Sequence, residues 1–285
     1  SQAQMTQWLQ VLARQLWDAP GQRLHYRHLS DLIMARRELS AAIDPTRVDL
    51  ELRTASFLTR NSAGDYGFSH RSFLEFFLAR ALVQCLMDTR EAGLEAAAEQ
   101  LVAALPDARL SPECLRFFQD LAQLACADVT PFWLHASRVV RQLLSKVRAP
   151  ARSANALRMA RECAADPQEW IPEGAELAGA DLSDEAWPLP LRKANLRGAR
   201  LQRCRFSAGG NGPRVADLTA AILVEAEVDH ANFGGARLRS ADATGIRGEW
   251  KTRIGAHCQQ ASFAGAYQRE ADVRAAARDG ADFSA

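Results

Sequence analysis

The chain has 285 residues, a length that suits one large domain or two ordinary ones, and 48% of the residues are hydrophobic. Its 35 basic and 34 acidic residues give a net charge of +1, which argues against strong non-specific binding to nucleic acid or to an anionic membrane. No apolar run approaches the ~18 residues of a membrane span, and the first ten residues, SQAQMTQWLQ, lack the basic and apolar parts of a secretory signal. We therefore expect a cytoplasmic protein.

The cysteines and histidines form no metal-binding pattern. The six cysteines are widely spaced and none forms a C-x-x-C pair, and His25 and His28 have no acidic or cysteine partner beside them. Zinc sites and redox motifs use closely spaced ligands, so we expect no metal site and free thiols kept reduced in the cytosol.

The first half of the chain has the spacing of apolar residues that is typical of helices. Two short apolar stretches within 57–70 instead flank Asn-Ser-Ala-Gly-Asp, whose residues suit the turn of a hairpin. Three helices, a hairpin and a further helix is the element order of a winged helix. The segments expected to be helical are 4–17, 28–39, 47–57, 70–87, 91–105, 111–127, 131–147 and 151–165.

The helix after the hairpin carries start signals. Ser69 is expected to cap it, and Ser72 with Glu75 has the spacing of a capping box. The aromatic and leucine residues from Phe73 to Leu78 predict a broad apolar face that belongs to the core.

The stretch from Tyr66 to Leu82, YGFSHRSFLEFFLARAL, resembles the Y-x-F-x-H-x-x-F-x-E-[YF]-x-A-A element of NACHT-type signalling ATPases, the STAND class. Arg80 stands where that family often has a second alanine. The resemblance covers roughly residues 5–87 and implies that this element closes a winged-helix domain behind an ATPase core. It also implies that His70 contacts the phosphate of bound ADP; the alternative is that His70 simply caps the helix and packs.

From Ala175 onward the sequence repeats every five residues. Small residues, mostly alanine, recur at this interval, and a large apolar residue follows two positions after most of them, as in Ala216 with Leu218 and Ala231 with Phe233. A period of five fits neither a helix nor an alternating strand. It fits a square coil in which each five-residue side turns one small and one large side chain inward.

This pattern resembles the pentapeptide-repeat family, A-(D/N)-L-x-x, over about 110 residues. The resemblance implies a right-handed quadrilateral β-helix, here of roughly five coils at a spacing of about 4.8 Å. The chain is thus expected to be a multidomain α and β protein, with a winged-helix-like domain at 1–90, an α-helical domain at 91–170 and the β-helix at 171–285.

Three segments interrupt the repeat. PLPLRK (188–193) and SAGGNGPRV (207–215) shift its phase, so both are expected to bulge from the coil as loops. GIRGEWKTRI (245–254) keeps the phase without the apolar pattern, and we expect it to distort a coil or to expose Trp250.

No catalytic motif is present. The chain has no Ser/His/Asp set, no H-E-x-x-H and no G-x-x-x-x-G-K-[ST], so we expect no enzyme activity and no cofactor of its own. If the STAND resemblance holds, ADP or ATP with Mg²⁺ binds an ATPase core upstream of Ser1. The repeat acids are expected to bind turn amides or face water; they are Asp181, Asp217, Asp242, Asp272 and Asp282.

One local cluster of charge stands out. No acid lies between Ala186 and Pro213, and the basic residues of this stretch, here called the arginine strip, could form a basic face for phosphates or for an acidic partner; a solvated surface is the alternative. The strip comprises Arg192, Lys193, Arg197, Arg200, Arg203 and Arg205.

The leading hypothesis is a regulatory and sensor region of a bacterial NACHT-type ATPase in immune (anti-phage) or conflict signalling, which binds a trigger protein or another subunit through the repeats. The alternative is a stand-alone pentapeptide-repeat protein that acts on DNA or a DNA-associated enzyme. Imitation of duplex DNA needs an acidic surface, and the 15 basic and 14 acidic residues from Ala175 onward do not provide one. A winged helix that reads DNA through Arg47–Arg53 is a third possibility, although that segment is rich in acids.

Overall fold

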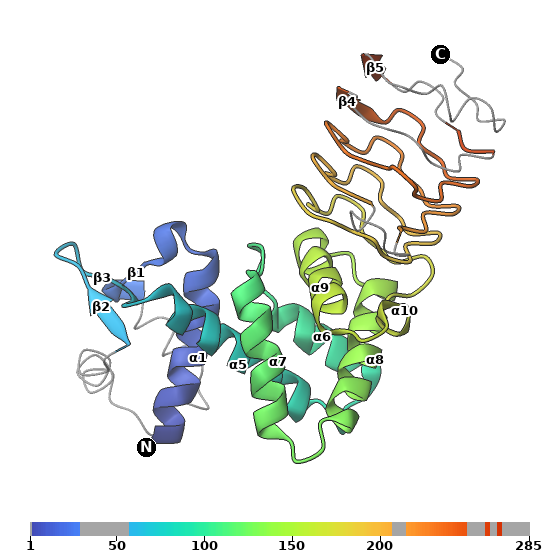
Figure 1. Cartoon of the computed structure of the whole chain (residues 1–285). Helices are drawn as coiled ribbons and strands as arrows, with labels where there is room; N and C mark the ends of the chain where they lie inside the picture. Colours follow the sequence, from blue (N-terminus) through green and yellow to red (C-terminus); the bar gives the residue numbers. More distant parts are fainter. Residues whose placement is uncertain (1, 29–56, 207–214, 250–259, 263–266, 270–285) are drawn as a thin grey trace. The chain divides into compact units, whose positions relative to one another are not determined.

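The computed structural model describes residues 2–28, 57–206, 215–249, 260–262 and 267–269. The chain forms two compact units (Figure 1). The first comprises Ser1–Arg90 with Ala103–Phe132, and the second comprises Glu91–Val102 with Trp133–Ala285. The expected boundary at 170/171 thus lies inside the second unit. In the part of the chain described, no helix is both long and apolar enough to cross a membrane.

The first unit begins with helix α1 (Gln2–Asp18) and the short 3-10 helix η1 (Pro20–Gln22). A three-stranded antiparallel sheet follows in the order β1-β3-β2, made of β1 (Leu24–His25), β2 (Leu58–Arg60) and β3 (Asp65–Phe68). The predicted hairpin is confirmed: the Gly64 amide donates to the Asn61 carbonyl at 3.1 Å, and Gly64 supplies the positive φ that the turn requires.

Helix α5 (Arg71–Asp88) begins at the second of the two caps considered for it. His70 is the N-cap, and its Nδ1 accepts a hydrogen bond from the Ser72 amide at 3.1 Å. The expectation that Ser69 caps the helix is wrong. Glu75 does not close a capping box either, because its carboxylate accepts from the Arg71 guanidinium and the Ser111 hydroxyl.

The core of the first unit lies between α1, α5 and α7 (Pro112–Ala125). Residues of α1 that recur at helical spacing are buried, among them Leu9, Leu12 and Leu16. As predicted, α5 turns a broad apolar face inward, and the Phe77 ring stacks on Phe68 of β3 at 5.7 Å. The hairpin is thereby held against the helix that follows it.

The second unit contains four helices and the repeat coil. The helices are α6 (Leu94–Ala104), α8 (Thr130–Lys146), α9 (Pro150–Cys163) and α10 (Pro167–Trp170). Five helices predicted from the sequence after residue 70 are confirmed to within a few residues, whereas α10 was not predicted. The helices expected at 28–39 and 47–57 lie outside the described residues.

The repeats form stacked coils whose neighbours are joined by parallel β-bridges (Figure 1). Within the coil from Ile222 to Asp242, four bridged positions follow one another at five-residue steps, at Ile222, Glu227, Asn232 and Arg237. The residues on either side of each bridged position point inward and are buried, as the period of five predicted. The strands β4 (Arg247–Glu249) and β5 (Tyr267–Arg269) continue the stack in register.

Each side of the coil ends in a tight turn. The amide of Ala221 donates to the Leu218 carbonyl at 3.0 Å, and Ala220 between them has a positive φ of 56°; the same turn recurs after Leu196, Leu223 and Phe233. A positive φ at the third residue is what a type II turn requires. Glycine occupies this position in several turns and other residues occupy it in the rest, so the turn is imposed by the stack as well as by local sequence.

One predicted loop is wrong. Segment 188–193 does not bulge, because Leu189 and Leu191 are buried and Pro190 bridges Asp217 of the next coil. The coil is instead shortened, so that Glu176 bridges Asn195 nineteen positions later rather than twenty. The loop expected at 207–215 and the exposure of Trp250 lie, except for Val215, outside the described residues.

Candidate functional site

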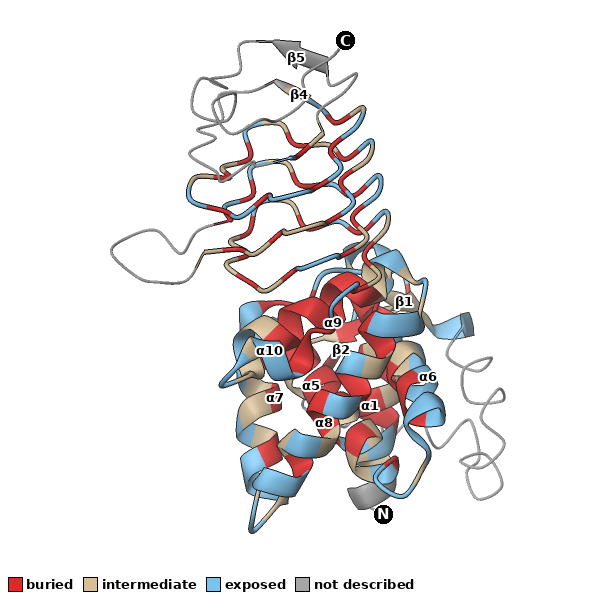
Figure 2. Cartoon of the chain, turned by 90° about the vertical axis from the view of Figure 1, so that its right-hand side faces the viewer, coloured by how far each residue is buried: buried red, intermediate tan, exposed pale blue. Residues whose placement is uncertain are grey.

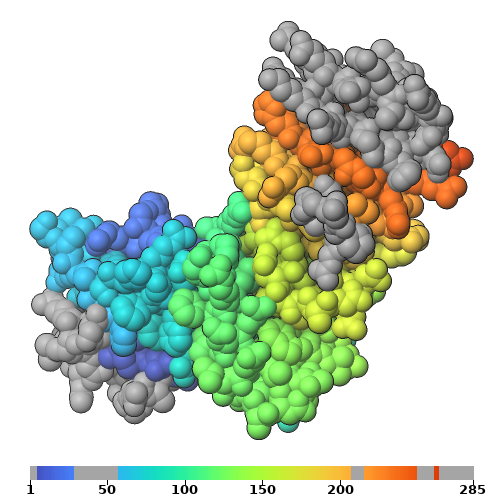
Figure 3. All heavy atoms as spheres, in the orientation of Figure 1, coloured from blue at the N-terminus to red at the C-terminus, as the bar shows by residue number. Residues whose placement is uncertain are grey.

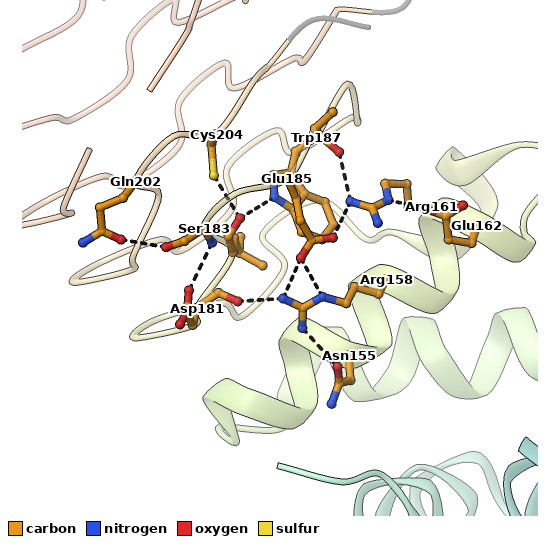
Figure 4. Close-up of polar contacts among 12 residues, drawn as sticks. Asn155, Arg158, Arg161, Glu162, Asp181, Ser183, Glu185, Trp187, Gln202 and Cys204 are labelled. Atoms are coloured by element: carbon orange, nitrogen blue, oxygen red, sulfur yellow. Dashed lines mark hydrogen bonds and ion pairs between the residues drawn. The ribbon is translucent and has the colours of Figure 1, made fainter. Parts of the chain in front are cut away.

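The most elaborate polar site described lies where α9 meets the first coil (Figure 4). Residues 153–160 of α9 are buried without interruption, and Figure 2 shows this helix red along most of its length. A helix buried on all faces is packed between other elements. In Figure 3 the yellow-green atoms of α9 and α10 adjoin the yellow atoms of the first coil.

Glu185 of the first coil is the centre of this site. Its carboxylate accepts from Arg158 at 2.7 Å and from Arg161 at 2.7 Å, and both arginines come from α9. The side chains of Arg158 and Glu185 are only 5% and 4% exposed. A buried carboxylate is tolerated when it is paired and hydrogen-bonded, and both conditions are met here.

The two arginines also bind backbone oxygens of the first coil. Arg158 donates to the Asp181 carbonyl at 3.0 Å and to the Asn155 side chain at 3.0 Å, and Arg161 donates to the Ala186 carbonyl at 3.0 Å. The Arg161 guanidinium lies 4.3 Å from the centre of the Trp187 ring, a cation–π contact. The donors of α9 thus satisfy coil carbonyls that have no preceding coil to bind them.

Helix α8 holds the same end of the coil. The Arg141 guanidinium donates to the Gln168 and Ile171 carbonyls at 3.0 and 3.2 Å, just before the repeats begin. The Glu176 amide donates to the Leu144 carbonyl at 2.6 Å. We call these contacts, together with the Arg158–Glu185–Arg161 network, the joint. They fix the first coil to α8 and α9.

The joint has the chemistry of a structural connection. Its acid and both bases are engaged with one another, and its tryptophan is buried. Among the residues described, no group of three or more His, Cys, Asp or Glu side chains is placed to hold a metal ion. The arrangement can transmit a displacement of the coil to α9, because the two cannot separate without exposing a buried ion pair.

The sequence reasoning missed this site, although a signal was present. Glu185 occupies the inward position that is alanine at Ala180 and Ala175, and Trp187 replaces the usual leucine. A charged residue at an inward position of a repeat requires a buried partner of opposite charge. The partners come from α9, and the period of the repeat does not indicate which helix packs against the first coil.

His70, the predicted nucleotide contact, is exposed at the start of α5. Its Nδ1 accepts the Ser72 amide, so in the neutral ring the proton sits on Nε2, which is then a donor. The tautomer is fixed by this hydrogen bond.

The structure does not gather the arginine strip on one side of the coil. Positive-φ turns at Lys193, Gly198 and Arg203 separate its members onto successive sides. Most of them also have acidic partners: Arg192 and Lys193 contact Glu173, Arg200 contacts Glu227 and Arg203 contacts Asp184. Among the described residues, only Arg197 and Arg205 of the strip have no ion pair.

Opposite charges alternate along one side of the coil. Asp181, Arg200, Glu227 and Arg247 bridge in succession, one in each coil. Stacked neighbours of opposite sign attract across a sheet, and this described side of the coil is not the acidic surface that imitation of duplex DNA needs. The repeat acids serve the turns instead: Asp181, Asp217 and Asp242 each accept the amide two residues ahead, as predicted. Asp272 and Asp282 lie outside the described residues.

Comparisons with known proteins found similar solved structures but no family model. No protein-family model and no curated protein matches the chain. The solved structures that resemble it include a pentapeptide repeat protein from the cyanobacterium Cyanothece 51142, with 17% identity, a TM-score of 0.28 and coverage of 41% of this chain and 69% of that one.

Two further structures are similar. HetL, a pentapeptide repeat protein involved in heterocyst differentiation regulation in Nostoc, shares 23% identity with a TM-score of 0.30, over 39% of this chain and 52% of HetL. A plasmid-mediated fluoroquinolone resistance protein shares 17% identity with a TM-score of 0.20, over 39% of this chain and 71% of that one. Scores at this level carry no argument, and the description of the coil rests on its own period of five and its parallel bridges.

Proposed function

We propose that the chain is a regulatory, non-catalytic region in which the repeat coil is a stiff arm that binds a partner protein or another subunit. The joint is the observation that carries this proposal. Because Glu185 holds Arg158 and Arg161 in a buried network, a force on the coil acts directly on α9. A flexible tether would dissipate such a force, whereas a buried ion pair with satisfied hydrogen bonds transmits it.

The more specific proposal is that this region belongs to a bacterial NACHT-type STAND ATPase that acts in anti-phage or conflict signalling in the cytoplasm. Its support is the sequence resemblance from Tyr66 to Leu82, whose residues form β3 and α5 with an exposed His70 between them. The Nε2 donor of His70 and the positive end of the α5 dipole suit a phosphate. ADP or ATP with Mg²⁺ would be held by an upstream ATPase core.

In this mechanism His70 stabilises the ADP-bound, closed state. A partner that binds the coil more tightly in the open state shifts the population toward that state, and the shift is limited by its difference in affinity for the two. The alternative of a stand-alone protein that acts on DNA or a DNA-associated enzyme finds less support, because acids and arginines alternate along the coil.

The test uses the full-length protein with its upstream segment. His70→Asp keeps a good N-cap for α5 while it places a negative charge toward the phosphate. His70→Ala removes both the cap and the donor. We expect ADP to dissociate faster from both variants and basal activation to rise, most in His70→Asp.

The control is His230→Asp, which changes an exposed histidine of the coil in the same way. It should leave nucleotide retention unchanged. Unchanged ADP dissociation in His70→Asp, with α5 intact by circular dichroism, would refute the nucleotide role while leaving the binding role of the coil to be judged on its own.

A further inference from the structure

Two arginines converge on one exposed tyrosine in the small sheet of the first unit. The Arg60 guanidinium carbon at the end of β2 lies 4.6 Å from the centre of the Tyr26 ring, and that of Arg27 lies 5.9 Å from the same centre. All three residues are exposed, and Tyr26 is 39% exposed. We call Tyr26, Arg27 and Arg60 the sheet cluster; β1, β2 and β3 are labelled in Figure 1.

The hairpin is built to hold this cluster. A Cβ atom on Gly64 would lie 2.8 Å from a Tyr26 ring carbon, a distance that real Cβ atoms do not reach, so glycine makes the room that the ring occupies. The buried Tyr66 ring lies 5.6 Å from the Arg60 guanidinium carbon, so two aromatic rings contact this one cation. His25 contacts the Tyr26 ring at 4.5 Å. The two rings therefore hold the Arg60 side chain in place without a ligand.

Neither arginine of the sheet cluster has a counter-ion among the residues described. Asp65 is the acid nearest in the described sequence, and its carboxylate accepts from the Asn61 side chain at 3.0 Å. The arginine strip differs in this respect, because four of the six residues of the strip contact acids. The strip stands out in the sequence and is largely neutralised by the fold, whereas the sheet cluster is inconspicuous in the sequence and keeps its charge.

Two like charges beside one ring repel each other, and an anion that binds near both relieves this repulsion. The guanidinium group presents a planar fork of donors that matches the oxygens of phosphate. The geometry points to the sheet cluster as a binding surface for the phosphate backbone of a nucleic acid. The described segments around the cluster, 19–28 and 57–64, contain no acid, which suits a chain of successive phosphates.

This surface is a separate expectation from base reading by Arg47–Arg53, a segment that lies outside the described residues. The net charge of +1 for the whole chain does not oppose it, because the coil and α9 contain many of the matched pairs. Binding by so few phosphate contacts is weak, insensitive to base sequence and steeply dependent on salt. It is independent of the role proposed for His70, which lies beyond the opposite end of β3.

The test measures the anisotropy of a fluorescein-labelled 20-nucleotide DNA strand, single- and double-stranded, against the whole chain at about 50 mM salt. We expect Arg27→Gln with Arg60→Gln to weaken binding about tenfold and to lower the salt slope by about two. The control, Arg200→Gln with Arg237→Gln, removes the same charge from arginines of the coil that already contact acids. It should change binding by less than about twofold.

Each other result overturns the inference. Equal weakening in both double variants would indicate non-specific attraction by the whole chain. Binding of polyglutamate as tight as that of the oligonucleotide would assign the cluster to an acidic protein segment. Binding of ATP as tight as that of the oligonucleotide would assign it to a free nucleotide, and no binding at about 50 mM salt would remove it as a site. Circular dichroism of the variants shows that the fold is kept.

Discussion

The Arg158 guanidinium lies 2.7 Å from the Glu185 carboxylate, and the two side chains are 5% and 4% exposed. An ion pair this deeply buried adds little net stability over an apolar pair of equal volume, because both charges lose their hydration. The loss of one partner is a different matter, since it leaves the other charged and buried. The pair thus fixes where the first coil sits on α9.

Glu185→Ala is therefore expected to destabilise the second unit by about 3–5 kcal/mol. It leaves the Arg158 and Arg161 guanidinium groups without their carboxylate. The measurement is urea unfolding, with hydrogen exchange of coil amides as the local readout, because a chain of two units need not unfold in one step.

The adjacent residue supplies the control. Asp184 pairs with Arg203 in a bidentate contact, 2.9 Å for one of its two bonds, but both side chains are exposed. Asp184→Asn, which tolerates the positive φ of 64° at this position, should cost only a small part of the Glu185→Ala effect, because water screens and replaces an exposed pair. Equal losses in the two variants would show that burial does not determine the strength of the joint.

Elements with a regular period were predictable, and contacts between elements were not. The helices after residue 70, the hairpin turn and the coil followed from the spacing of apolar residues. The cap of α5 did not, because both Ser69 and His70 can accept a backbone amide and the geometry at the end of β3 decides between them. Segment 188–193 was expected to be a loop because its two prolines shift the phase, yet Pro190 still bridges the next coil.

The arginine strip shows the same limit for the candidate site. Six basic residues close together in the sequence suggest a basic surface patch. In the coil, turns rotate successive residues to new sides and bring acids from neighbouring coils beside them, such as Glu227 beside Arg200. The sheet cluster arises in the opposite way, from Arg60 and Tyr26, which are distant in sequence.

Gly198 allows the energy of one turn to be measured by itself. Its φ is 61°, and a Cβ atom there would meet nothing within 4 Å, so Gly198→Ala adds backbone strain without a clash. We expect a loss of about 1 kcal/mol in unfolding free energy. Gly198→Asn, whose side chain is better tolerated at positive φ than that of alanine, should lose less. An equal loss in the two variants would mean that the turn conformation is not the cause.

Cys204 is expected to resist alkylation in the native protein. Burial raises the pKa of its thiol to about 12, and its Sγ donates to the Leu182 carbonyl at 2.9 Å. At pH 8 the thiolate that reacts with iodoacetamide is therefore scarce and inaccessible. Peptide mapping after a timed reaction should find Cys126, which is half-buried, modified well before Cys204. Early modification of Cys204 would contradict its place inside the coil.

The same thiol makes the coil sensitive to alkali. The pKa of the Cys204 thiol in the folded chain is above its ordinary value of 9.0. The thiol of the unfolded chain therefore ionises first as the pH rises. The contribution of Cys204 to folding stability is complete below pH 9 and is lost between pH 9 and about 12. Cys204→Ala should lower stability at pH 8 and show a smaller further loss at pH 11 than the native chain does. The measurement is thermal unfolding at the two pH values.

Asp18 gives the first unit a sensitivity to acid. Burial alone would raise the pKa of its carboxyl, but the amides of Ala108 and Asp107 and the Arg14 guanidinium outweigh it, and the pKa is lowered. The amide contacts are 2.8 and 3.1 Å long. A folded pKa below the unfolded value of 3.8 means that this stabilisation is present above pH 3.8 and is lost as the pH falls through the folded pKa.

Asp18→Asn tests this argument. The amide side chain keeps one acceptor oxygen and loses the charge, so at pH 7 we expect a loss of about 1–2 kcal/mol, in the lower part of the range for hydrogen bonds to a charged group because water reaches this carboxylate. As the pH falls through the folded pKa, the carboxyl of the native chain becomes protonated as well, and the difference between the two proteins should shrink toward zero. Asp120→Asn, an exposed change on α7 of the same unit, should show no such dependence. A stability difference between Asp18→Asn and the native chain that stays constant between pH 7 and pH 2 would mean that altered packing or hydrogen bonding, and not the lost charge, destabilises the variant.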